Sequence, residues 1–205
     1  MDLVFYTAPM SSATPVATVL AELQIPHETV VVDLSKGEEG KGDLRKHNPH
    51  AKVPTLLVDG TPMFEALAIM QWLGDRFGVE RGLWPAPGDP ARLQALSWTT
   101  WSYVEYGPAM VRFYLASHDS MPAEMKNAAQ AERAKEQLDT HLRILDERLA
   151  ERGWLIGDAF SLADLIVANV IAYGAVCGVG VERHERVAAW LSACQGRPSF
   201  QSAWG

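Results

Sequence analysis

Residues 48–72 read NPHAKVPTLLVDGTPMFEALAIMQW, and three local signals overlap within them. Residues 55–58 are a short apolar run rich in strand formers, and the Asp-Gly pair that follows favours a two-residue hairpin turn before the chain returns as a second strand. From Glu65 the apolar residues recur at helical spacing until Gly78, which is expected to end the helix. The stretch therefore predicts an antiparallel hairpin whose second strand leads directly into a helix.

Pro54 stands immediately before the first strand and has no backbone N–H to donate, so it belongs at a strand start. An X-Pro bond adopts the cis form at a cost of only about 0.5–1 kcal/mol, and a cis Val53-Pro54 bond would turn the N–H and C=O of Val53 away from the sheet. The first N–H groups of the helix, at Glu65 and Ala66, are unpaired and lie at the positive end of its dipole. The pattern favours a site for a small anionic peptide, although an ordinary strand and helix start would give the same spacing.

These residues are similar to the peptide-binding core of the glutathione transferases, and the similarity extends over essentially the whole chain. Residues 68–73 are especially close to the bacterial beta class of that family. The resemblance implies that glutathione is a co-substrate and that the protein is a homodimer. The residues that carry the resemblance are Asn48, Pro49, Lys52, Val53, Pro54, Phe64, Glu65, Ala68 and Ile69.

The chain has 205 residues, which suits one large or two small domains, and its 48% hydrophobic and 21% charged residues are a globular composition. The net charge of −7, without a lysine- or arginine-rich block, argues against nucleic acid or an anionic membrane as the main partner. Residues 1–23 lack the pattern of an export signal, and no apolar run reaches membrane-spanning length. A cytoplasmic protein is therefore expected.

Cysteines and histidines are too scattered in the sequence for a disulfide framework or a metal site. Cys177 and Cys194 are far apart and lie outside any Cys-x-x-Cys motif, so we expect reduced core residues. Only His47 and His50 are close together, and they lack the two further ligands that a metal site needs. We therefore expect no metal.

The N-terminal part of the chain predicts a strand–helix–strand unit. Residues 3–6 form a short apolar strand, a helix with proline in its first turn starts near Pro15, and the valine-rich residues 28–32 form a second strand. Such a unit pairs its strands in parallel through a right-handed crossover. With the hairpin and its helix added, residues 1–78 resemble a thioredoxin-like, glutathione-binding domain.

After a turn-rich linker over residues 79–90, strand signals largely vanish, and an all-helical domain is expected over residues 91–205. A long helix over residues 93–117 should be kinked at Pro108, and another should start at Pro122. The fold class is therefore α/β plus all-α, with a thioredoxin-like domain followed by a helical bundle.

Ser161 and Asp164 precede an apolar run and predict a capping box at the start of a buried helix. This role is structural and carries no chemistry of its own. The last helices are expected over residues 187–191 and 198–204.

The loop after the first strand is the candidate catalytic segment. A thiol titrates near about 8.5, so its activation at neutral pH needs a positive or hydrogen-bond-donating environment such as a helix N-terminus. In serine-type classes of the family the activating hydroxyl lies five residues after a strand tyrosine, as Ser11 follows Tyr6, and the resemblance therefore assigns Ser11 as the donor to the glutathione thiolate. Tyr6 and Ser12 are alternative donors, and Ser11, Ser12 or Thr14 could instead only cap the helix.

The chain departs from the beta class at positions that matter for its chemistry. Ser11 stands where that class has a cysteine and Gly107 where it has a histidine, so thiol–disulfide exchange through a protein cysteine is not expected. Ala66 replaces the serine that many classes place on the glutamyl carboxylate, which predicts a modest affinity for glutathione.

The resemblance also assigns the remaining contacts with glutathione. Glu65 should accept a hydrogen bond from the ligand's ammonium group, and Lys36 should lie near its glycine carboxylate. Lys52 is a weaker candidate for that second role. The predicted glutathione-binding residues are Lys36, Lys52, Val53, Pro54, Glu65 and Ala66.

The acceptor substrate is expected in an apolar pocket, in which the thiolate attacks an electrophilic carbon without a covalent enzyme intermediate. The aromatic residues of the predicted helix over residues 93–117 could line this pocket, but packing in the core would explain their spacing equally well. The predicted lining residues are Met10, Tyr103, Tyr106, Met110 and Tyr114.

Two other functions fit the same scaffold. A glutathione-dependent isomerase or reductase is disfavoured because Ala13, rather than a cysteine, follows the two serines of the loop. A non-catalytic interaction module is the second alternative, since a fold alone does not fix a function. Retention on a glutathione resin would separate the enzymes from the module.

Overall fold

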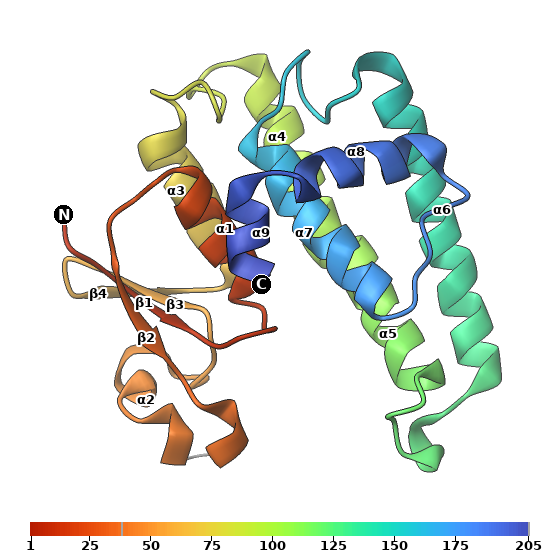
Figure 1. Cartoon of the computed structure of the whole chain (residues 1–205), viewed down its shortest axis with the longest axis horizontal. Helices are drawn as coiled ribbons and strands as arrows, with labels where there is room; N and C mark the ends of the chain where they lie inside the picture. The colour runs from red at the N-terminus through yellow and green to blue at the C-terminus, as the bar shows by residue number, and fades with distance from the viewer. Residues whose placement is uncertain (38, 205) are drawn as a thin grey trace. The chain divides into compact units, whose positions relative to one another are not determined.

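The computed structural model describes residues 1–37 and 39–204, and these divide into two compact units (Figure 1). The first unit is formed by Met1–Gly82 together with the segment that begins at Gly196. The second unit is formed by Leu83–Gln195. None of the helices in the described residues is long and apolar enough to cross a membrane.

The first unit is built on a four-stranded mixed sheet with the strand order β2-β1-β3-β4. β1 pairs with β2 in parallel and with β3 antiparallel, and β3 pairs antiparallel with β4. The two parallel strands, β1 and β2, come directly before and after the first helix in the sequence, as the strand–helix–strand pattern predicts. The strands are β1 (Leu3–Thr7), β2 (Glu28–Val31), β3 (Thr55–Val58) and β4 (Thr61–Phe64).

The predicted hairpin is confirmed, with Val58 paired to Thr61 across its turn. Asp59 and Gly60 have φ values of 48° and 79°, so both central residues are left-handed. This is the geometry of the primed turns that match the twist of the two strands, and it explains the Asp-Gly pair.

Helices cover both faces of the sheet in the first unit, with α1, α3 and α9 on one face and α2 on the other (Figure 1). Leu3 and Phe5 of β1 are almost fully buried. The helix after the hairpin continues past its last α-helical residue as a π-helical segment, Gly74–Gly78. The helices are α1 (Thr14–Glu22), α2 (Leu44–His47), α3 (Ala66–Leu73) and α9 (Pro198–Trp204).

α9 packs against α1, although it follows the helical unit in the sequence. The Arg197 guanidinium donates to both carboxylate oxygens of Glu22, and Ser199 donates to the same carboxylate. Burial alone would raise the pKa of Glu22, but these hydrogen bonds and the charge of Arg197 outweigh it and lower the pKa. The structure thus groups α9 with the sheet, whereas the sequence pattern places it in the helical range 91–205.

The second unit is all helical, as predicted. The long helix expected over residues 93–117 is divided by a π-helical segment, Ser102–Tyr106, and Pro108 lies in the first turn of the helix that follows. Its α-helices are α4 (Pro90–Trp101), α5 (Gly107–Ser117), α6 (Ala128–Arg152), α7 (Leu162–Val176) and α8 (Glu185–Gln195).

The prediction that a helix starts at Pro122 is wrong. Pro122 precedes only a short 3-10 turn, Ala123–Met125, and α6 begins at Ala128. Asn127 is its N-cap, and the Asn127 side chain accepts from the N–H of Gln130 at 3.0 Å. An asparagine cap satisfies a free N–H of the first turn, which a proline cannot do.

The capping box of α7 is confirmed. Asp164 is fully buried, and one of its oxygens accepts from the N–H and the hydroxyl of Ser161 at 2.9 and 2.8 Å. The other oxygen accepts from the N–H of Leu155 at 2.8 Å and from the indole of Trp190 at 3.0 Å. This carboxylate therefore joins the start of α7 to α8, a structural role.

Candidate glutathione site

Ser11 lies in the loop between β1 and α1. Its Oγ donates to the main-chain oxygen of Ala8 at 2.7 Å and accepts from the N–H of Ala13 at 3.1 Å. The preceding residue, Met10, has a φ of 49°, which turns the chain sharply toward the helix. A serine hydroxyl has a single proton, so Ser11 can donate to a thiolate only after its hydroxyl turns away from Ala8.

The predicted cis bond between Val53 and Pro54 is confirmed. The Val53 carbonyl, however, accepts from Oγ of Ser12 at 2.8 Å. Within the residues that the structure describes, the Val53 N–H has no acceptor. The main chain of Val53 thus offers a free donor and an acceptor with one lone pair remaining.

Asn48 fixes the loop that leads to Val53, a role that the sequence patterns missed. It is 2% exposed, and its side-chain NH2 group donates to the main-chain oxygen of Lys52 at 2.9 Å and to Oγ1 of Thr55 at 3.0 Å. Its side-chain oxygen accepts from the N–H of His50 at 2.9 Å, and Thr55 donates to the same Lys52 oxygen at 3.0 Å. The Asn-Pro pair marks such a turn but does not reveal these partners.

Glu65 occupies a strained position at the entrance of α3. Its φ is 73° and its ψ is 113°, although the residue is not a glycine. Such conformations cost of order 1–3 kcal/mol and gather at functional sites. The first intrahelical bond runs from the N–H of Ile69 to the Glu65 carbonyl, so the N–H groups of the first turn, beginning at Ala66, have no acceptor in the helix.

The start of α3 therefore presents opposite charges side by side. The exposed Glu65 carboxylate can accept an ammonium group, and the free N–H groups behind it can bind a carboxylate at the positive end of the helix dipole. An α-amino acid group carries both of these charges. The arrangement is thus chemically suited to the amino end of a peptide ligand.

The other predicted residues of the first unit lie at its surface or edge. Lys36 is exposed and forms an ion pair with Asp33 at 3.3 Å. The side chain of Lys52 is exposed, while its main-chain oxygen is part of the Asn48 network. The Tyr6 ring is half-buried and lies against His47, with 5.6 Å between the ring centroids.

The predicted acceptor residues differ in their surroundings. Met10 is exposed, Tyr103 is half-buried, and Met110 is buried. Tyr114 donates to or accepts from the Ser120 hydroxyl at 3.1 Å and stacks on His118. Tyr106 is fully buried and packs so closely on Gly174 that an added Cβ there would lie 2.4 Å from its hydroxyl oxygen.

Within the described residues, the buried Tyr106 hydroxyl has no hydrogen-bond partner. Burial raises the pKa of Tyr106, so its hydroxyl stays protonated at neutral pH. Tyr106 therefore belongs to the packed interior of the helical unit.

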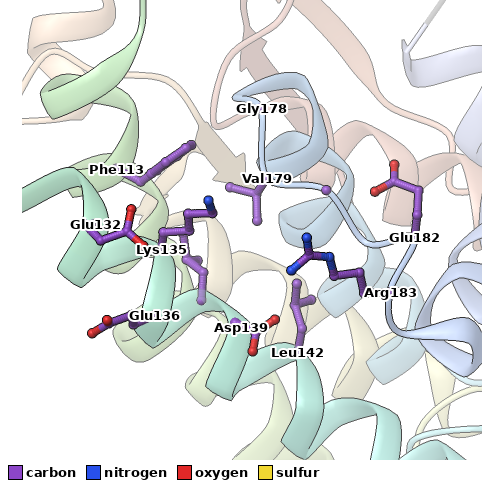
Figure 2. Close-up of a pocket in the computed structure, with 12 residues that line it drawn as sticks. Phe113, Glu132, Lys135, Glu136, Asp139, Leu142, Gly178, Val179, Glu182 and Arg183 are labelled. Atoms are coloured by element: carbon purple, nitrogen blue, oxygen red, sulfur yellow. The ribbon is translucent and has the colours of Figure 1, made fainter. Parts of the chain in front are cut away.

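The helical unit also carries a surface pocket of about 430 Å³ between α5, α6 and the loop after α7 (Figure 2). Phe113, Leu138 and Val179 supply apolar walls, and Lys135 and Arg183 extend into it from opposite sides. Carboxylates line it as well, so its charges are mixed. The lining contains none of the acceptor residues predicted from the sequence.

Three comparisons with known proteins agree on one family. Models of the glutathione S-transferase N-terminal and C-terminal domains match residues 10–76 and 108–198. Glutathione S-transferase 3 of Zea mays is 30% identical over 202 residues, covering 96% of this chain and 90% of that protein. Glutathione S-transferase GstA of Escherichia coli O157:H7 is 29% identical over 176 residues, covering 85% of this chain and 83% of that protein.

A solved structure of a sphingomonad glutathione S-transferase complexed with glutathione is 28% identical, covers 98% of this chain and 96% of that chain, and has a TM-score of 0.82. The fold therefore defines a class of protein in which a thioredoxin-like domain with a small mixed sheet is followed by a helical domain. The predicted fold class is confirmed. The chain belongs to the glutathione S-transferase family.

Proposed function

We propose that the protein is an enzyme that joins the glutathione thiolate to a small electrophilic, hydrophobic substrate. The observation that carries this proposal is the convergence, in one unit, of a free Val53 N–H with the strained Glu65 and the open first turn of α3. These groups provide a donor for a peptide main chain and a place for an amino acid group. The relatives of the chain are glutathione S-transferases, which supports glutathione as the peptide.

In the proposed complex, each end of glutathione meets a group of opposite charge. The γ-glutamyl ammonium binds the Glu65 carboxylate, and the γ-glutamyl carboxylate binds the N–H groups that begin at Ala66. The cysteinyl main chain pairs with Val53 beside Pro54. Lys36, or less favourably Lys52, attracts the glycine carboxylate.

Ser11 is the proposed activating group, on a scaffold similar to the bacterial beta class with a serine in place of its cysteine. Its hydroxyl turns from Ala8 and donates to the sulfur, which stabilises the thiolate relative to the thiol. The thiolate then forms a carbon–sulfur bond as the leaving group departs with the electron pair of the broken bond. The thiol proton passes to solvent water, and the positioning of the resulting thiolate together with this deprotonation supplies the rate enhancement.

The proposed acceptor contacts are the residues predicted from the sequence, with the exception of Tyr106. Tyr103 and Tyr114 are half-buried residues, and we retain them as candidates for apolar contact with the acceptor. Met10 and Met110 remain candidates as well, whereas Tyr106 acts through packing. The acceptor is defined only by its chemistry, an electrophilic carbon on an apolar group.

The test combines binding to a glutathione resin with conjugation of glutathione to an activated aryl chloride. The native chain should be retained, should be eluted by free glutathione, and should accelerate conjugation. Glu65→Gln should reduce both, because the ammonium loses its carboxylate partner. Glu80→Gln is the matched control, since it removes an exposed carboxylate of the same unit to which the proposal assigns no contact with glutathione.

Each other outcome selects a different function. Retention without conjugation of aryl chloride, epoxide or enone substrates, but with disulfide reduction or isomerisation, would identify the reductase or isomerase alternative. Retention with no turnover of any kind would identify a binding module. A native chain that the resin does not retain would refute the proposal.

A further inference from the structure

Ser12 makes a contact that the proposed chemistry does not use. Its Oγ donates to the main-chain oxygen of Val53 at 2.8 Å, across 41 residues of sequence. Ser12 lies on an exposed loop, whereas Val53 is only 7% exposed. This hydrogen bond therefore connects an exposed loop to a buried residue of a distant segment.

Within the part of the chain that the structure describes, the hydroxyl of the neighbouring Ser11 has only local partners. Its hydroxyl bonds to Ala8 and Ala13, which lie three and two residues away, and so shapes the turn in which it sits. These bonds do not fix where the turn lies relative to the hairpin. Ser12 does so, because its partner belongs to the segment that leads into β3.

The far end of this bond is held in place independently. The carbonyl of Lys52, the residue before Val53, accepts hydrogen bonds from Asn48 and from Thr55, and both of these side chains are buried. Val53 is thus part of a segment with little freedom to move. The hydrogen bond from Ser12 to this segment therefore holds the loop between β1 and α1 in a defined position.

We propose that Ser12 is a positioning residue for glutathione binding, which holds the loop that carries Ser11 against the Val53 carbonyl. This inference rests on the proposed function. A carbonyl oxygen has two lone pairs, and Ser12 uses one of them. The other accepts a main-chain N–H of the bound peptide, so Ser12 also sets the direction from which the peptide meets Val53.

A residue in this role acts on binding rather than on the acidity of the thiol. Ser12→Ala leaves the Ser11 hydroxyl and its local turn in place but releases the turn from Val53. A typical net hydrogen bond corresponds to a change of about two- to tenfold in an equilibrium constant. Ser12→Ala is therefore expected to raise the Kd and KM for glutathione about two- to tenfold, with a much smaller change in kcat at saturating glutathione.

The experiment measures three quantities in the full-length chain. Calorimetry gives the Kd for glutathione, ultraviolet absorbance gives the pKa of the bound thiol, and amide hydrogen exchange of residues 8–13 without glutathione reports the freedom of the loop. Ser12→Thr keeps the hydroxyl and should restore the native values. Ser117→Ala is the matched control, because it also removes an exposed hydroxyl that donates to a main-chain oxygen, that of Phe113 at 2.7 Å.

The inference stands if Ser12→Ala raises the Kd and speeds exchange of the loop, leaves the pKa of the bound thiol unchanged, and is rescued by threonine. Unchanged exchange and Kd would overturn it, and so would a higher thiol pKa, which would make Ser12 the activating group. If instead the proposed function is wrong, the native chain itself will bind no glutathione, and this result differs from all of those above.

Discussion

Replacing Ser11 with alanine is expected to raise the pKa of glutathione's thiol when it is bound to the protein. The hydroxyl of Ser11 is the small donor that the loop brings to the start of α1, and its proton now rests on the Ala8 carbonyl at 2.7 Å. When glutathione binds, the same proton can turn to the sulfur. Alanine removes that donor, together with the oxygen that accepts from the N–H of Ala13 at 3.1 Å, and leaves every residue of α1 unchanged.

The size of the effect follows from the two bonds that the hydroxyl exchanges. A hydrogen bond to a charged group contributes about 1.5–3 kcal/mol, and a neutral one about 0.5–1.5 kcal/mol. Because the bond to Ala8 is given up when the bond to sulfur forms, the net gain is about 1–2 kcal/mol. One pKa unit corresponds to about 1.4 kcal/mol, so Ser11→Ala should raise the thiol pKa by roughly one.

The assay is an absorbance titration of the bound thiolate in native protein, Ser11→Ala and Tyr6→Phe, together with conjugation rates at neutral pH. Tyr6→Phe should change the pKa much less, because the Tyr6 ring lies against His47, the last residue of α2. A clear rise in Tyr6→Phe with none in Ser11→Ala would reverse the assignment. No rise in either variant would leave the main-chain N–H groups of the helix start as the activating groups.

Three further predictions concern the scaffold. Glu22→Gln should destabilise the fold by about 1–3 kcal/mol in urea unfolding at pH 7, because it removes the carboxylate that accepts from Arg197 and Ser199, whereas the exposed control Glu28→Gln should have little effect. Since the pKa of Glu22 is lowered in the folded state, its contribution is complete above its ordinary pKa and should disappear as the pH falls through the folded value; a native-to-Gln difference that grows toward acid pH would contradict this. Gly174→Ala should cost about 1–3 kcal/mol by crowding the Tyr106 hydroxyl, and less in a Tyr106→Phe background; equal costs in both backgrounds would rule out that contact as the cause. The chain should sediment as a homodimer, and a mass of one chain at micromolar concentration would exclude it.

Short-range patterns predicted much of the first unit. The Asp-Gly turn, the proline at the strand start and the change from strand to helical spacing at Glu65 are all decided by neighbouring residues, and each was confirmed. The same reasoning is wrong at Pro122, because both Pro122 and Asn127 are residue types that commonly stand at the start of a helix. Proline suits a first helical turn, but Asn127 satisfies an N–H that proline leaves open, and the helix begins after the asparagine.

Features that depend on distant residues could not be predicted from such patterns. The bond from Ser12 to Val53 spans 41 residues, and a serine in a loop looks the same in the sequence whether its hydroxyl bonds locally or far away. The aromatic spacing around Tyr106 is equally compatible with a pocket wall and with a packed interior. Its complete burial and its contact with Gly174 place it in the interior.

The packing of α9 on α1 has a consequence for synthesis on the ribosome. The strands and first helices are translated early, but the guanidinium that neutralises Glu22 is supplied by Arg197, which emerges only after the whole helical unit. Until then, the Glu22 carboxylate at the end of α1 lacks its partner Arg197, the residue immediately before α9. The contacts that α9 and Arg197 supply to α1 can therefore form only after more than a hundred residues of the second unit have been translated.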